Sequence, residues 1–85
     1  MMVEGIMVYT FDVWKIWIGQ EDYVAYQGMP IEINLHNHYL KFIIGKDYDD
    51  WFVEFKEDVT FNLRKFDVYK VRVESIELMT EEDAF

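Results

Sequence analysis

Two histidines separated by one asparagine, His36-Asn37-His38, are the residues with the clearest potential for metal chemistry. On a β-strand, residues i and i+2 share a face, so both imidazoles could hold a divalent metal together with a carboxylate. The next acidic segment offers that carboxylate from Asp47, Asp49 or Asp50. Asparagine, however, tolerates positive φ, and the shared face disappears if the chain reverses at Asn37. We therefore expect exposed turn residues and predict neither a metal nor a cofactor, with His36 and His38 as the candidates should a metal bind.

Residues that perform covalent or phosphate chemistry are scarce. The chain has no cysteine, which excludes thiol chemistry, disulfides and thiolate metal sites. Its single serine, Ser75, has neither a nucleophile elbow nor a nearby histidine in the sequence. The four glycines are isolated and form no phosphate-binding loop. The acidic segment 46–50 lacks the length, the glycine and the final glutamate of an EF-hand loop. The sequence predicts that this protein is not an enzyme.

Carboxylates dominate the charge. Asp and Glu number 17 against 8 Lys and Arg, for a formal net charge of −9, and the excess lies at both ends of the chain. Such a charge repels nucleic acid and anionic lipid and attracts basic surfaces at low salt. Cations alternate with phenylalanines between Phe52 and Arg72, as in some single-strand binders, but neighbouring acids cancel their field. We expect no direct nucleic-acid or membrane binding. The expected partner is a protein with a basic surface, or a second copy of this chain.

The residue types favour strands, since Val, Ile and the aromatic residues (3 Trp, 6 Tyr, 7 Phe) are abundant. Apolar and polar residues alternate in a series of short segments separated by turn-like residues. The alternation changes phase at Val13 and Trp14, which predicts a β-bulge or a sharp bend there. We predict an all-β domain over residues 1–79, followed by a frayed acidic tail over residues 80–85. Its fold would be a small antiparallel barrel or a strongly bent sheet of six to seven short strands, in the size class of SH3-like and OB-like barrels.

Some large apolar side chains fall on the face of their strand that otherwise carries polar residues. Trp17 and Phe52 each lie opposite their apolar sequence neighbours, as does Ile43. In a single-layer sheet these side chains would face water. Either barrel closure, bulges or a covering tail bury them, or they form an exposed patch of the kind that marks a protein contact. The sequence leaves both alternatives open.

The leading hypothesis is a non-enzymatic, acidic protein-interaction module that contacts its partner through Trp17 and Phe52. A sharper version is an inhibitor that mimics nucleic-acid charge on a basic partner, by analogy with small phage-encoded inhibitors of nucleases or polymerases. Its phosphate mimics would be Asp47, Asp49, Asp50, Glu81, Glu82 and Asp83. One alternative is a homo-oligomeric structural subunit with Trp17 and Phe52 at its seam. Another is a small-ligand or metal-binding barrel that uses His36 and His38.

The N-terminal residues carry no basic segment of the kind that opens a signal peptide. No apolar run approaches the roughly 18 residues of a membrane span. We therefore expect a cytoplasmic protein.

Overall fold

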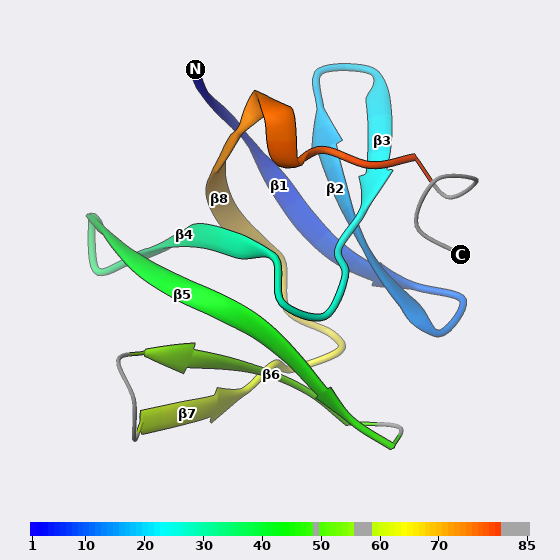
Figure 1. The fold of residues 1–85 in the computed structure, drawn as a ribbon, viewed down its shortest axis with the longest axis vertical. Coiled ribbons are helices and arrows are strands. Elements are labelled where there is room, and N and C mark those ends of the chain that lie inside the picture. Colours follow the sequence, from blue (N-terminus) through cyan, green and yellow to red (C-terminus); the bar gives the residue numbers. More distant parts are fainter. Residues whose placement is uncertain (49, 56–58, 81–85) are drawn as a thin grey trace.

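The computed structural model describes residues 1–48, 50–55 and 59–80. Over these residues the chain forms one antiparallel sheet of eight strands in the order β3-β2-β1-β8-β4-β5-β6-β7, which bends over on itself (Figure 1). The strands are β1 (Met2–Thr10), β2 (Val13–Ile18), β3 (Glu21–Val24), β4 (Pro30–Leu35), β5 (His38–Asp47), β6 (Asp50–Phe55), β7 (Val59–Asn62) and β8 (Tyr69–Glu74). A single turn of 3-10 helix, η1 (Ser75–Glu77), follows β8.

The predicted all-β, antiparallel class is confirmed, and the strand number is corrected from six or seven to eight. The barrel alternative is also corrected, because β3 and β7 stand at opposite ends of the strand order. The described part of the chain contains no helix long and apolar enough to cross a membrane.

The β1–β2 hairpin overturns the bulge predicted at Val13 and Trp14. Phe11 and Asp12 have φ values of 49° and 70°, and Thr10 pairs directly with Val13. Two successive residues with positive φ are typical of the two-residue type I′ turn, whose twist matches that of the flanking strands. The phase change in the sequence therefore marks a reversal of the chain and not a bend within one long strand.

The predicted reversal at Asn37 is confirmed. His36 and Asn37 have φ values of 52° and 68°, and the backbone N–H of Asn37 donates to the Asn34 side-chain oxygen at 3.1 Å. Leu35 pairs with His38 across the resulting hairpin. The acidic segment 46–50 lies largely within the β5–β6 hairpin, since β5 continues to Asp47 and pairs there with Asp50.

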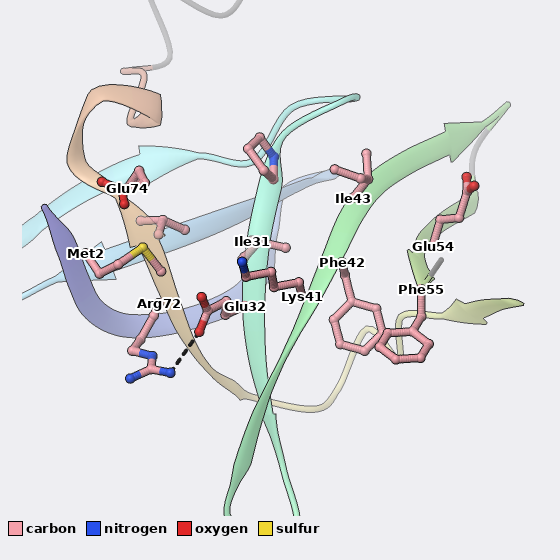
Figure 2. A pocket seen from close by; sticks show the side chains of 12 residues that line it. Met2, Ile31, Glu32, Lys41, Phe42, Ile43, Glu54, Phe55, Arg72 and Glu74 are labelled. Carbon is pink, nitrogen blue, oxygen red and sulfur yellow. Dashed lines mark hydrogen bonds and ion pairs between the residues drawn. The ribbon is translucent and has the colours of Figure 1, made fainter. Parts of the chain in front are cut away.

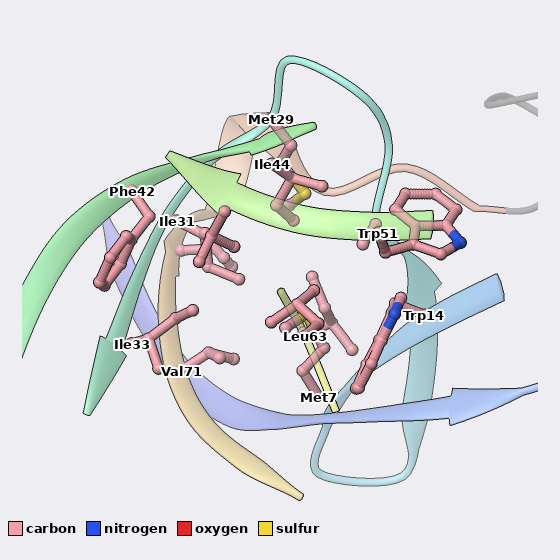
Figure 3. Packing of buried hydrophobic residues seen from close by; sticks show 14 residues of the cluster. Met7, Trp14, Met29, Ile31, Ile33, Phe42, Ile44, Trp51, Leu63 and Val71 are labelled. Carbon is pink, nitrogen blue, oxygen red and sulfur yellow. The ribbon is translucent and has the colours of Figure 1, made fainter. Parts of the chain in front are cut away.

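The core lies between the two halves of the bent sheet. Apolar side chains from the β1–β2 half meet those from the β4–β5–β6 half, with β8 between them (Figure 3). Trp14 is fully buried and its ring lies 5.4 Å from Tyr9 and 5.7 Å from Tyr69. Truncating such a ring to alanine costs about 3–5 kcal/mol. The largest fully buried side chains are Trp14, Met7, Ile16, Met29, Ile33, Ile44, Val24, Val71 and Val73.

The segment after β8 covers part of the β3 edge. The backbone N–H of Val24 donates to the Met79 carbonyl at 2.9 Å, and the Tyr26 hydroxyl donates to the Glu77 carboxylate at 2.7 Å. The predicted tail at 80–85 is described only at Thr80, and the remainder lies outside the described residues.

Candidate functional site

A groove of about 850 Å³ lies along β4, between β8 and the start of β1 on one side and β5 and β6 on the other (Figure 2). We call it the β4 groove. Its buried lining includes Ile31 and Phe42, each 3% exposed. Exposed apolar side chains and charged groups complete it: Met2, Pro30, Ile43, Glu32, Lys41, Glu54, Arg72 and Glu74.

The groove exists because β4 and β8 pair over only two positions. Glu32 pairs with Arg72 and Ile33 with Val71, whereas β1 follows β8 along six residue pairs. Proline has no backbone N–H and cannot donate to a neighbouring strand. Pro30, at the start of β4, therefore cannot donate a backbone hydrogen bond that would extend the β4–β8 ladder, and the groove opens beside it.

One wall of the groove is a fixed ion pair. A guanidinium nitrogen of Arg72 lies 2.8 Å from the Glu32 carboxylate, and the side chain of Glu32 is only 16% exposed. The Arg72 guanidinium also stacks 3.9 Å from the centre of the Tyr39 ring. Because both the charge and the plane of Arg72 are engaged, this residue shapes the wall and neutralises Glu32.

The other charged groups of the groove differ in how they are paired. The N-terminal amine lies 2.7 Å from the Glu74 carboxylate. Lys41 and Glu54 form no ion pair within the described residues. Both are neighbours of Ile43, which is 45% exposed: Lys41 lies two residues before it on β5, and Glu54 pairs with it on β6. The arrangement thus presents one carboxylate and one cation next to the same apolar side chain. Such a surface suits a ligand that has both an apolar part and a charge.

The two predicted aromatic contacts are not brought together. Trp17 is 36% exposed on β2 and pairs with Ile6 of β1. Phe52 pairs with Gly45, and its half-buried ring fills the space that a side chain at residue 45 would occupy. Four strands separate β2 from β6 in the sheet order. Trp17 and Phe52 therefore do not form one patch. Gly45, on the neighbouring strand, explains why a large ring at residue 52 can lie on the opposite face from its apolar sequence neighbours.

The predicted charged and histidine sites also lie in separate parts of the chain. Asp47 and Asp50 are exposed and directly opposite each other at the end of the β5–β6 hairpin. Asp49, Glu81, Glu82 and Asp83 lie outside the described residues. His36 and His38 are exposed at the β4–β5 turn, and within the described residues no three His, Asp or Glu side chains come close enough to hold a metal.

The sequence missed most of the groove. Ile43 stood out by its parity, but Glu54, Met2 and Arg72 gave no signal of their own, because strand neighbours bring them together from distant segments. The one local signal was Pro30 at the start of a strand, which indicates an interrupted ladder.

Comparison of the chain with protein-family models, with curated proteins and with solved structures finds no match.

Proposed function

We propose that this protein is a non-enzymatic interaction module that binds a basic segment of another protein in the β4 groove. The observation that carries the proposal is the combination, in one groove of about 850 Å³, of exposed apolar side chains with the Glu54 carboxylate, which forms no ion pair within the described residues. Lysine and arginine lay their methylene stems on apolar surface while their charges reach toward polar groups. A partner's basic side chain would lie over Ile43 and place its cation beside Glu54.

The charge of the whole chain supports the same kind of partner. A net charge of −9 speeds encounter with a basic surface, and the effect weakens as salt screens it. Asp47 and Asp50 extend the negative surface to the end of the neighbouring hairpin. The nucleic-acid mimic is the finer form of this proposal, in which the basic segment belongs to a nucleic-acid channel.

A lysine hexapeptide, titrated into ¹⁵N-labelled protein, tests the proposal with a defined probe. We expect amide shifts confined to the groove residues of β4, β5, β6 and the end of β8, and weaker binding when NaCl rises from about 0.05 to about 0.5 M. A glutamate hexapeptide should produce no such shifts. Shifts spread evenly over the acidic surface would mean that only the net charge is recognised and would overturn the proposal.

Matched variants separate the groove from the net charge. Glu54→Gln should weaken hexapeptide binding about fivefold, which corresponds to about 1 kcal/mol for an exposed ion pair. Glu21→Gln makes the same charge change on β3, outside the groove, and should leave binding nearly unchanged. Equal losses in the two variants would contradict a role for the groove.

The size of the groove favours a second candidate, a small zwitterionic ligand. Small-molecule sites commonly measure about 300–1,000 Å³. Lys41 and Glu54, which are both neighbours of Ile43, would bind the carboxylate and the ammonium group of such a ligand. Thermal stabilisation by free amino acids or dipeptides, without any response to the lysine hexapeptide, would select this candidate over the first.

A further inference from the structure

The two edges of the sheet are built differently. At β3, two of the four residues are acidic, Glu21 and Asp22, and Val24 is bonded to Met79 of the chain's own C-terminal segment. Charged residues and covering segments are the usual means by which an edge strand avoids pairing with another chain. At β7 the sequence Val59-Thr60-Phe61-Asn62 contains no charge and no proline, and within the described residues this strand is bonded only through β6.

The side chains of β7 are also unusually open. All four residues of the strand are exposed, including Val59 at 45% and Phe61 at 48%. Both lie on the face of the sheet that carries the core, since Phe61 pairs with buried Val53 and Val59 pairs with Phe55. The Phe61 ring reaches to within 6.0 Å of Phe42. The apolar face of the sheet is therefore partly exposed at this edge, and one more strand beside β7 would cover it.

From these observations we propose that β7 pairs antiparallel with β7 of a second copy of this chain, extending the sheet across a two-fold axis. The first three residues of the strand, Val59-Thr60-Phe61, are self-complementary. With Thr60 opposite Thr60 of the other copy, Val59 lies opposite Phe61 in both directions. Cross-strand pairs of an aromatic and a β-branched residue, and of two threonines, are favourable in antiparallel sheets.

A second copy fits this edge because pairing opposes no charged residues of the strand, although each chain carries −9. Within the described residues, the carboxylate that pairs with this strand is that of Glu54, opposite Thr60 on the outer face of the sheet. In the dimer the two copies of Glu54 would be three strand spacings apart, roughly 14 Å. Repulsion over that distance is screened by added salt. Dimerisation should therefore strengthen with salt, whereas binding of a basic partner should weaken.

Sedimentation equilibrium of the complete chain at low and high NaCl tests the proposal. Three residue pairs bury less surface than a standard interface, so we expect a weak dimer that forms near about 1 mM protein. The dimer fraction should rise when NaCl increases from about 0.05 to about 0.5 M. A monomer at every concentration and salt, or a dimer that weakens with salt, would overturn the proposal.

A charge on the two-fold axis provides the specific variant. Thr60→Glu would place four carboxylates in one row, two from residue 54 and two from residue 60, and should abolish the dimer. Gln27→Glu adds the same charge in the exposed turn before β4 and should leave the dimer unchanged. Circular dichroism establishes whether both variants keep the β fold.

A mixing experiment distinguishes charge repulsion at residue 60 from other reasons why Thr60→Glu could fail to dimerise. An equimolar mixture of Thr60→Glu and Thr60→Lys should form a heterodimer, because the opposite charges then face each other on the axis. Thr60→Glu alone should remain monomeric. Retention of the dimer in Thr60→Glu alone, or no heterodimer in the mixture, would show that the seam lies elsewhere.

Discussion

Two glycines contact their neighbours in different ways, although both sit within strands. A side chain at residue 5 would collide with the backbone carbonyl of Trp17, on the adjacent strand. A side chain at residue 45 would collide with the ring of Phe52. A ring can rotate away, whereas a strand backbone moves only with its whole ladder. Gly5 is thus required for the close approach of β1 and β2, while Gly45 provides a place for one aromatic ring.

The difference predicts unequal costs for the same substitution. Gly5→Ala should lower the free energy of unfolding by about 2–3 kcal/mol, at the upper end for overpacking, because the obstructing atom is backbone. Gly45→Ala, the matched control, should cost about 1 kcal/mol, because Phe52 can yield. Urea unfolding of the three proteins checks this. Equal losses would mean that the β1–β2 backbone adjusts as readily as a side chain.

At the scale of elements, tight hairpins join most of the neighbouring strands. Phe11 and Asp12 both adopt positive φ, and the phenyl ring of Phe11 is 95% exposed. Phenylalanine is unfavourable in this region because its Cβ crowds the following carbonyl, a cost of about 1–2 kcal/mol for an ordinary residue. Asparagine tolerates the same conformation. This hairpin therefore closes with a residue that does not favour its turn and gains little burial in return.

Phe11→Asn should stabilise the protein by about 1 kcal/mol, because it relieves the turn and removes a ring that packs on little. Phe11→Val, which keeps an apolar side chain but is β-branched, should be less stable than the natural chain. Thermal unfolding at one protein concentration orders the three proteins. A loss of stability in Phe11→Asn would indicate that the exposed ring makes a stabilising contact.

The same hairpin marks the limit of prediction from sequence. Alternation of apolar and polar residues located the strands, and Asn37 identified one turn by its type. Phe11 does not favour a turn, so the sequence pattern predicts a bulge where the chain in fact reverses. The groove is even harder to predict from the sequence, since it depends on which strands flank β4 and on the length of the β4–β8 ladder. Strand order is set by long-range packing, which local periodicity does not encode.

At the scale of the whole molecule, one tyrosine links the chain between β3 and β4 to the segment after β8. The Tyr26 hydroxyl lies 2.7 Å from the Glu77 carboxylate and 3.0 Å from the Glu77 carbonyl oxygen. Burial, the hydrogen bond to Glu77 and the negative charge of Glu77 together raise the pKa of Tyr26 to about 12, from the ordinary value of 10.0.

A raised pKa in the folded state makes stability depend on alkaline pH. The folded chain holds the Tyr26 proton more tightly than the unfolded chain, so this contribution is complete below about pH 10 and is lost as pH rises toward about 12. Tyr26→Phe should lower stability by about 1 kcal/mol at pH 9, and the difference from the natural chain should shrink between pH 10 and 12. Urea midpoints over that range check this.

Tyr23→Phe serves as the control for the pH series. Tyr23 donates to Glu21 at 2.7 Å on the β3 edge, and that bond raises its pKa, but it joins two residues of the same strand. Its removal should change stability little below pH 10. If Tyr26→Phe and Tyr23→Phe gave the same pH profile, the contact between Tyr26 and Glu77 would not be what holds the C-terminal segment in place.

The position of β8 has a consequence for how the protein is made. This strand lies between β1 and β4, so the first strand synthesised finds its long-range neighbour only after about 60 further residues have been added. Until β8 leaves the ribosome, the β1–β2–β3 unit and the β4–β5–β6–β7 unit have no strand to join them. Folding of this sheet is thus expected to be completed after translation has passed β8. Until then the apolar inner faces of both units are open to chaperones.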